Sequence, residues 1–210
     1  MLLSTAYFPP VEYFALMAEC AEVYVEACEN YQKQSYRNRL RFYAENGVQS
    51  LNVPVVHEGG RYSLPIREIK VDWSTPWLER SKRALDSAYH SSAFFDYYRD
   101  SLYEVLDRRP ETLFELNMSI TEYLISKLGL RTKILLTEDY YPDSGPYGPD
   151  FRNVIHPKRP NTILEDRGLK KPYFQVFAQK HGFISNLSAI DLLFNEGPDS
   201  ISYLRTSSRG

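Results

Sequence analysis

The chain has 210 residues, a formal net charge of −2, and hydrophobic and charged shares of 43% and 25%. These values predict one domain with one substantial core. They argue against nucleic-acid or membrane-surface binding, which usually needs an excess of basic residues. No run approaches the roughly 18 apolar residues that a membrane helix requires. The absence of a basic signal segment at the start, and the presence of only Cys20 and Cys28, predict a cytoplasmic protein.

The first part of the chain reads as short strands around one helix. An apolar run stops at Pro9 and Pro10, and a second run alternates around Val23 and Val25. A third run contains Pro54, which favours an edge strand or a bulge. Residues 37–46 fit either state, and Gly47 breaks the chain after them. The resulting predictions are strands at 2–7, 22–27 and 51–56 and a helix at 11–20.

The middle of the chain reads as a helical region. A turn at 58–63 and a short strand at 67–71 precede it. Thr75 and Pro76 signal the start of the first helix. The clearest helix runs from Thr112 to Leu128 and ends at Gly129, which suits the position after a helix. Apolar spacing predicts helices around 77–88, 95–105 and 112–128, followed by a buried strand at 132–137.

The last third begins with a long loop near 138–162 that is rich in proline and glycine. A strand at 173–177, a short final helix and a frayed tail follow. We therefore predict an α/β fold with a mainly parallel sheet and helices on both of its faces. The predicted single domain covers residues 1–204, and residues 205–210 form a disordered tail.

Two segments that follow predicted strands are candidate ligand-binding segments, because ligands of such sheets gather at the carboxyl ends of the strands. The first contains Tyr7, Pro9 and Tyr13. Its prolines fix a turn, and the hydroxyls of its two tyrosines could position a substrate. The alternative is that both tyrosines only pack in the core.

The second segment, Glu26–Arg39, contains a change in the sign of the charge. Residues 1–32 hold no lysine or arginine and five acids, which are Glu12, Glu19, Glu22, Glu26 and Glu29. Four cations then follow within nine positions, namely Lys33, Arg37, Arg39 and Arg41. Arginine forks match phosphate and carboxylate groups, so these cations predict an anionic small-molecule substrate. The alternative is a solvated basic face paired with neighbouring acids. The polar residues of this segment that we expect to bind substrate are Asn30, Tyr31, Arg37, Asn38 and Arg39.

Other chemistry has little support in the sequence. The four histidines lack metal-ligand spacing, so no metal site is predicted, and no cofactor is indicated. Neighbouring acids disfavour a thiolate at Cys28. The aromatic residues between 77 and 98 are expected to pack in the core. Asn117 lies beside the apolar stripe of its helix and would need hydrogen-bond partners, so it could orient a site residue or cap a loop. We include it among the expected substrate-binding residues.

At these residues the sequence resembles the WbqC-like protein family. The shared marks, which extend from residue 4 to about 200, are Tyr7, Pro9, Tyr13 and Phe14; Tyr31, Lys33, Tyr36, Arg37, Asn38 and Arg39; Leu51, Val53, Pro54 and Val55; and, more weakly, Trp77, Tyr89, Phe95, Asn117, Leu128, Gly129, Leu130 and Thr132. The ending from Gly182 to Pro198 is similar to a form found in Bacteroidetes-type sequences.

The chain departs from the family pattern at several places. Ser4 stands where many relatives carry Gln, and Arg80 stands where they carry His. Ala27 and Cys28 occupy the positions of an Asp-Asp pair. If those acids are catalytic in relatives, then either the neighbouring glutamates replace them or this branch performs different chemistry.

The resemblance implies a cytoplasmic transferase that acts on an activated sugar or on a small acyl or aminoacyl donor in surface-glycan biosynthesis. In that hypothesis Glu26 or Glu29 is the general base. Lys33, which we count among the catalytic residues, holds the anionic part of the donor or acceptor together with Arg37 and Arg39. The alternative is a ligand-binding or assembly module without catalysis, which the missing Asp-Asp pair favours.

Overall fold

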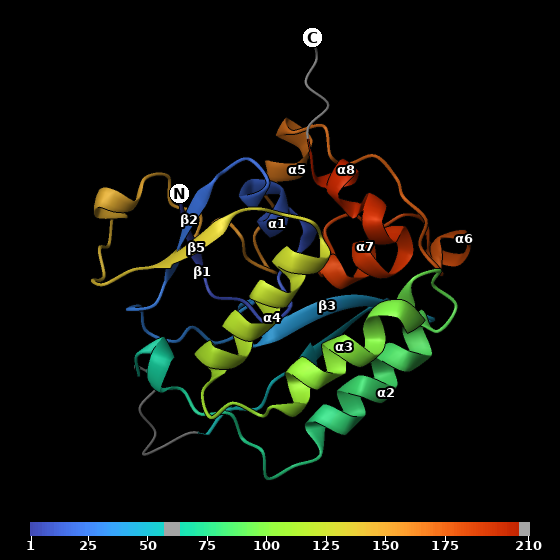
Figure 1. Ribbon diagram of the computed structural model, residues 1–210, viewed down its shortest axis with the longest axis horizontal. Helices are drawn as coiled ribbons and strands as arrows, with labels where there is room; N and C mark the ends of the chain where they lie inside the picture. Colours follow the sequence, from blue (N-terminus) through green and yellow to red (C-terminus); the bar gives the residue numbers. More distant parts are fainter. Residues whose placement is uncertain (57–63, 206–210) are drawn as a thin grey trace.

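The computed structural model describes residues 1–56 and 64–205, so the turn predicted at 58–63 and nearly all of the predicted tail lie outside the described residues. Its centre is a parallel three-stranded sheet of β1 (Leu2–Ser4), β2 (Glu22–Glu26) and β5 (Lys133–Leu136), in the order β1-β2-β5 (Figure 1). Val23 and Val25 of the central strand are fully buried. All three carboxyl ends therefore lie at one edge of the sheet.

A separate antiparallel hairpin joins β3 (Arg39–Ala44) to β4 (Gly47–Asn52). Gly47 has a φ of 93°, which glycine adopts without steric cost at such a turn. The hairpin lies between the parallel sheet and the helices α2 and α3 (Figure 1). Among the described strands, β3 pairs with β4 and not with the parallel sheet. It contacts the segment before α7, where Ser188 N donates a 2.9 Å hydrogen bond to Arg41 O.

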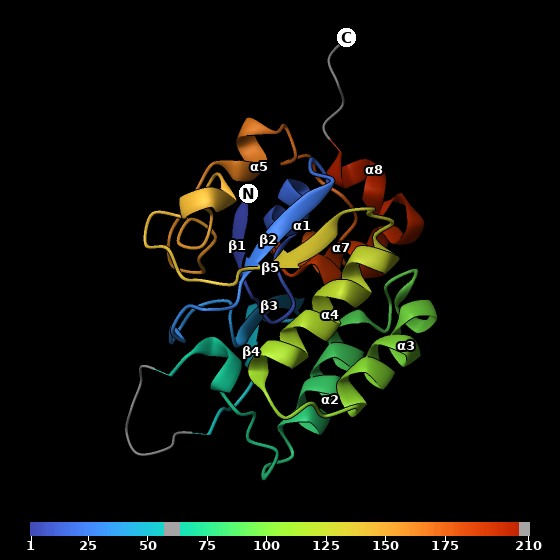
Figure 2. The same ribbon diagram turned by 60° about the vertical axis from the view of Figure 1, so that its left-hand side comes forward.

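The helices form two groups in the two views of Figures 1 and 2. The three long helices α2 (Trp77–Tyr89), α3 (Phe95–Asp107) and α4 (Leu113–Lys127) pack in sequence, and α2 also contacts β3. The second group surrounds α1 (Val11–Met17). The remaining helices are α5 (Ile163–Asp166), α6 (Ala178–His181), α7 (Ala189–Glu196) and α8 (Ser200–Leu204), with single 3₁₀ turns η1 (Ile66–Glu68), η2 (Gly145–Tyr147) and η3 (Gly197–Asp199).

Most predicted elements are present, with boundaries that differ by a few residues. The compact α/β fold and the parallel strands at the start and centre of the chain are confirmed, whereas helices on both faces of the sheet stay a prediction. The helix expected at 112–128 has a complete capping box: Thr112 Oγ1 accepts from Glu115 N, and the Glu115 carboxylate accepts from Thr112 N. Among the described residues, no helix is long and apolar enough to cross a bilayer.

Three predicted strands were wrong in place or in type. The strand expected at 51–56 instead ends at Asn52, because Pro54 cannot donate to a ladder and the chain turns away. Residues 67–71 form η1 and isolated bridges rather than a strand. Residues 173–177 are irregular, because Tyr173 and Gln175 turn inward to hydrogen-bond a buried carboxylate instead of pairing with a neighbouring strand.

That carboxylate belongs to Asp191 of α7, which is 1% exposed. It accepts hydrogen bonds from Tyr173 Oη at 2.6 Å, Gln175 Nε2 at 2.8 Å and Tyr89 Oη at 2.9 Å. Burial raises its pKa despite these donors. Asp191 therefore ties α7, α2 and the irregular segment before α6 to one point in the core.

We expect Asp191→Ala to lower the free energy of unfolding by about 3 kcal/mol, because three buried donors would lose their acceptor. Equilibrium urea denaturation measures this change. The exposed Asp199 is the matched control, and its alanine variant should stay within about 0.5 kcal/mol of the wild type. Equal effects of the two substitutions would contradict the structural role of Asp191.

Candidate functional site

The loops that follow β1 and β2 meet at the carboxyl edge of the sheet, as the sequence predicted. Tyr7 N donates to Tyr36 O at 2.8 Å, so the turn after β1 and the basic segment after β2 are in direct contact. Phe8 adopts a φ of 49° in this turn, a conformation that bulky residues rarely adopt. The tight turn brings Pro9 and Pro10 to the start of α1.

Arg37 is the central residue of this junction and is only 2% exposed. Its Nε and Nη2 donate to the two carboxylate oxygens of Glu29 at 2.8 and 2.6 Å. Nη2 also donates to Ser4 Oγ at 2.7 Å, at the end of β1. The Arg37 carbonyl oxygen accepts from Asn117 Nδ2 of α4 at 2.7 Å. The side chain and the backbone carbonyl group of Arg37 thus connect β1, the loop after β2 and α4.

A second buried ion pair lies at the end of β2. The Glu26 carboxylate, fully buried, accepts from Arg152 Nη1 at 2.8 Å and from Thr137 Oγ1 at 2.7 Å. It also accepts from Cys28 N at 2.8 Å. Arg152 in turn contacts both carboxylate oxygens of Asp150. Both glutamates proposed from the sequence as bases are therefore held in place by arginines.

The remaining predicted residues of the first segment are structural neighbours of this junction. Tyr7 and Tyr13 are buried, and burial raises the pKa of each hydroxyl. Tyr13 Oη donates to Ser4 O at 3.0 Å. The Pro9 carbonyl oxygen accepts from Ala189 N at 2.9 Å. These contacts fix the loop after β1 between the sheet and α7.

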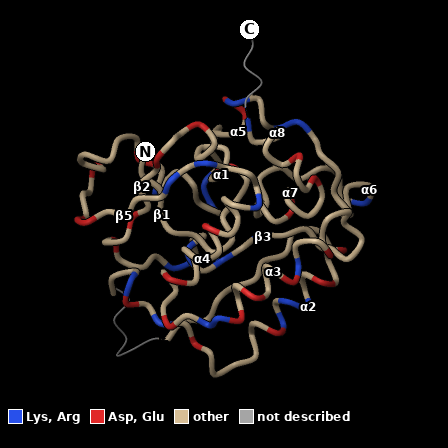
Figure 3. Tube along the Cα trace, viewed as in Figure 1, with Lys and Arg blue, Asp and Glu red and all other residues tan. Residues whose placement is uncertain are grey.

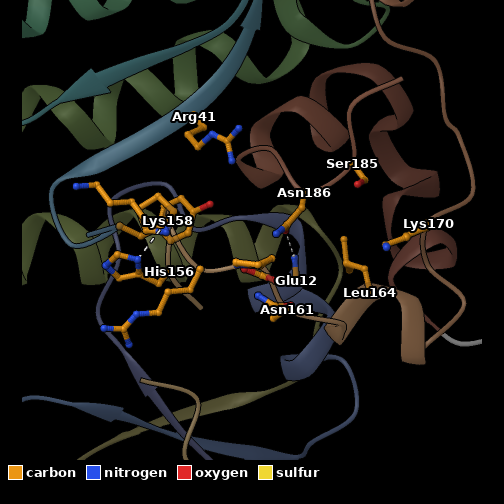
Figure 4. A pocket seen from close by; sticks show the side chains of 13 residues that line it. Glu12, Arg41, His156, Lys158, Asn161, Leu164, Lys170, Ser185 and Asn186 are labelled. Atoms are coloured by element: carbon orange, nitrogen blue, oxygen red, sulfur yellow. Dashed lines mark hydrogen bonds between the residues drawn. The ribbon is translucent and has the colours of Figure 1, made fainter. Parts of the chain in front are cut away.

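A cavity of about 400 Å³ opens next to this junction, and we call it the basic cavity (Figure 4). Its walls come from β3, from the loop before α5 and from the loop before α7. Arg41, Lys158 and Arg159 form no salt bridge with a described residue, whereas Lys170 pairs with Glu165 at 2.8 Å. The lining residues are Glu12, Tyr36, Arg41, His156, Pro157, Lys158, Arg159, Pro160, Asn161, Leu164, Lys170, Ser185 and Asn186.

The cations in and near the basic cavity act on the imidazole of His156. Burial lowers the pKa of His156, and the charges of Arg159, Arg37 and Lys158 lower it further. A neutral imidazole is thus favoured among several fixed positive charges. Acidic and basic residues are otherwise spread over most of the trace (Figure 3). The local positive charge therefore makes this cavity suited to an anionic ligand.

Glu12 is the one carboxyl group in the wall of the basic cavity, and it is 1% exposed. It lies in the first turn of α1, where Asn186 Oδ1 caps the helix by accepting from Glu12 N at 3.0 Å. Burial raises the pKa of Glu12, while hydrogen bonds from the Asn186 and Asn161 side chains partly oppose that shift. Figure 4 shows these three side chains grouped at the centre of the cavity.

The rest of the second predicted segment lines a separate open groove of about 300 Å³. We call it the Arg39 groove. Asn38 Nδ2 donates to Val53 O at 3.1 Å, and Arg39 Nε donates to Asn52 Oδ1 at 2.8 Å. Asn30 is exposed and forms an isolated bridge with Pro65 instead of lining the groove. The groove is lined by Tyr31, Lys33, Gln34, Asn38, Arg39, Asn52, Val53, Pro54 and Val55.

Sequence reasoning did not identify most of the basic cavity. Glu12 was noted only as an acid, and Arg41 only as part of the charge switch. Residues 156–161 lie in the stretch between β5 and α5, where η2 is the only regular element. The density of proline and glycine there was the available signal. Among residues 1–56 and 64–205, no cluster of acids, histidines and cysteines is suited to hold a metal.

The model of the WbqC-like protein family matches residues 5–146, about two thirds of the chain. This chain belongs to the WbqC-like protein family. A WbqC-like match that ends at residue 146 includes Glu12, Tyr36 and Arg41 of the basic cavity but not the wall from His156 onward. The Bacteroidetes-type grouping stays a prediction.

Comparison with known proteins adds one relative of this WbqC-like chain. It is 27% identical over 228 residues to a protein of Mycobacterium tuberculosis described as uncharacterized protein Rv1507c, and the match covers 97% of this chain and 96% of the relative. The relative thus extends over both the matched region and the C-terminal wall of the cavity. No solved structure matches the chain.

We expect Arg37→Gln to lower the free energy of unfolding by about 3–5 kcal/mol, because it leaves the Glu29 carboxylate buried without its partner. Adding Glu29→Gln should restore part of that loss, since the second substitution removes the uncompensated charge. Urea denaturation of the single and double variants measures both effects. Arg83→Gln, at an exposed position of α2, is the control. A double variant less stable than Arg37→Gln would contradict this account.

The raised pKa of Glu12 predicts a pH dependence of stability. The folded protein binds the Glu12 proton more tightly than the unfolded chain does. The stability gained is fully present below the ordinary carboxyl pKa and is lost as the pH rises through the raised pKa. Wild-type stability, measured relative to Glu12→Gln, should therefore fall across that window. A difference that grows with pH would show the opposite shift.

Proposed function

We propose that this WbqC-like protein is a group transferase that holds the anionic part of an activated donor in the basic cavity. The observation that carries the proposal is the placement of one buried carboxyl group, Glu12, in the wall of a cavity lined by Arg41, Lys158, Arg159 and Lys170. Buried acids with a raised pKa in such a cavity are typical of sites that move protons.

In the proposed reaction an amine or hydroxyl attacks the electrophilic carbon of the donor, which is the carbonyl carbon of an acyl or aminoacyl donor or the anomeric carbon of a nucleotide-linked sugar. The new bond to that carbon forms as the bond to the leaving group breaks, and the electron pair leaves with the leaving group. The Glu12 carboxylate accepts the proton of the attacking group, and the nearby cations stabilise the negative charge of the leaving group. The raised pKa makes the Glu12 carboxylate a stronger base than an ordinary carboxylate.

The residues proposed from the sequence take different roles in this mechanism. Glu26 and Glu29 position Arg152 and Arg37, and their burial in ion pairs supports a positioning role over proton transfer. Arg37 orders the segment that presents Tyr36 to the basic cavity. Asn117 holds the Arg37 backbone. Lys33 and Arg39 lie in the neighbouring groove rather than in the basic cavity.

The biological setting in this proposal comes from the family resemblance. It implies a donor that is a nucleotide-linked sugar, a small acyl thioester or an aminoacyl species, used in surface-glycan biosynthesis. Nucleotide-linked sugars, acyl-CoA thioesters and nucleotide-activated aminoacyl donors all carry phosphate groups, for which arginine and lysine side chains are suitable partners. The local charge of the basic cavity supports such a ligand without selecting among the three.

The test begins with a thermal-shift screen of nucleotide sugars, acyl-CoA thioesters and aminoacyl donors, because a ligand that binds the folded state raises the melting temperature. For a donor found in this way, Arg41→Gln should weaken affinity about tenfold by removing one charge-assisted contact. Arg83→Gln is the matched control for charge. Unchanged affinity in Arg41→Gln would overturn the assignment of the cavity.

Glu12→Gln separates catalysis from binding. It should retain the affinity for the donor and lower turnover about 10²–10⁴-fold, because a general base contributes on that scale. Mass spectrometry of donor and amine mixtures follows product formation. Equal turnover in Glu12→Gln and wild type would exclude Glu12 as the base. Binding without product, for any amine or hydroxyl acceptor, would favour the ligand-binding module that the missing Asp-Asp pair suggested.

A further inference from the structure

The Arg39 groove and the basic cavity lie side by side. Gln34 lines the groove, and its Oε1 accepts a hydrogen bond from Lys158 Nζ, a residue of the basic cavity. The connection also runs along β3, where Arg39 lines the groove and Arg41 lines the cavity. Residues two apart on a strand share one face and lie roughly 6–7 Å apart. The two arginines therefore present positive charge to neighbouring spaces.

The groove has the chemical character of a second ligand site. The Arg39 side chain donates through Nε to Asn52 Oδ1, and it forms no salt bridge with a described residue. Burial raises the pKa of the Tyr31 hydroxyl, and the positive charges of Arg37 and Arg39 partly lower it. The electrostatic field of the two arginines therefore reaches into the groove. Val53, Pro54 and Val55 supply an apolar surface beside these polar groups.

Two adjacent spaces with separate cations are what a two-substrate transfer requires. We infer that the Arg39 groove is a second anion-binding subsite, which holds a carboxylate or phosphate group of the acceptor between Lys33 and Arg39. The inference rests on the proposed group transfer, because that reaction needs a second substrate next to the donor. Tyr31 and the Val53–Val55 surface would contact the less polar part of the same acceptor.

The separation of the two spaces favours two ligands over one. No residue is shared between the linings, and the Lys158–Gln34 contact stands between them. The anchors of the two arginines also differ: Arg39 is fixed from β4 through Asn52, whereas Arg41 hydrogen-bonds the Tyr36 side chain. Loss of either arginine should therefore leave the other in place.

The experiment follows arginine Nε–Hε resonances by NMR in the full-length protein, with inorganic phosphate and acetate as separate probes at constant ionic strength. We expect the Arg39 and Arg41 signals to move with saturable curves while the Arg83 signal stays still. The phosphate and acetate arms show which oxyanion the groove prefers. An Arg39 signal that responds to neither probe beyond the response of Arg83 would overturn the inference.

Two variants separate this inference from the proposed function. In Arg41→Gln the Arg39 response should persist with a dissociation constant within about twofold of the wild type, and in Arg39→Gln the Arg41 response should persist likewise. Loss of the Arg39 response in Arg41→Gln would show one shared site and overturn the second subsite alone. If the Arg39 signal responds to the probes and the Arg41 signal does not, the assignment of the basic cavity to the donor would be overturned instead. If Arg39→Gln does not fold, Lys33→Gln replaces it as the groove variant. It should weaken the Arg39 response and leave the Arg41 response unchanged.

Discussion

The buried Arg37–Glu29 ion pair is the interaction on which the geometry of this protein depends. A bidentate pair fixes the plane of the guanidinium, and the same group reaches Ser4 at the end of β1. The backbone on either side is therefore held in a set orientation, with Tyr36 directed to the basic cavity and Asn38 and Arg39 directed to the groove. Buried pairs contribute little net stability compared with an apolar core, so the value of this one is in orientation.

The sequence predicted the fold where periodicity and capping were strong. The helix at 112–128 followed from apolar spacing and from Gly129 at its end, and the strand at 22–27 followed from alternating valines. The strand at 173–177 was predicted wrongly. Its aromatic and β-branched residues favour a strand locally, but composition does not show that a carboxylate from another part of the chain binds two of its side chains. Tyr173 and Gln175 satisfy Asp191, and that tertiary contact overrides the local preference for a strand.

The candidate site was predictable only in part, for a related reason. The sequence correctly placed the segments after β1 and β2 beside each other, because both follow parallel strands. It could not show that Arg37 and Glu29 face each other, since ion pairing depends on rotamers and burial. It also could not place Glu12 in a cavity, because Asn161 and Asn186, which contact its carboxyl group, lie about 150 or more residues away in the chain.

The turn His156–Arg159 forms much of the rim of the basic cavity, and two hydrogen bonds lie within it. Arg159 N donates to His156 O at 3.1 Å, and Lys158 N donates to His156 Nδ1 at 3.1 Å. It also lies beyond the region that the family model matches. A rim that folds on itself can change its residues with little effect on the core beneath it. Substitutions in this short turn are therefore a route to changing which ligand the basic cavity binds while the Arg37–Glu29 pair stays unchanged.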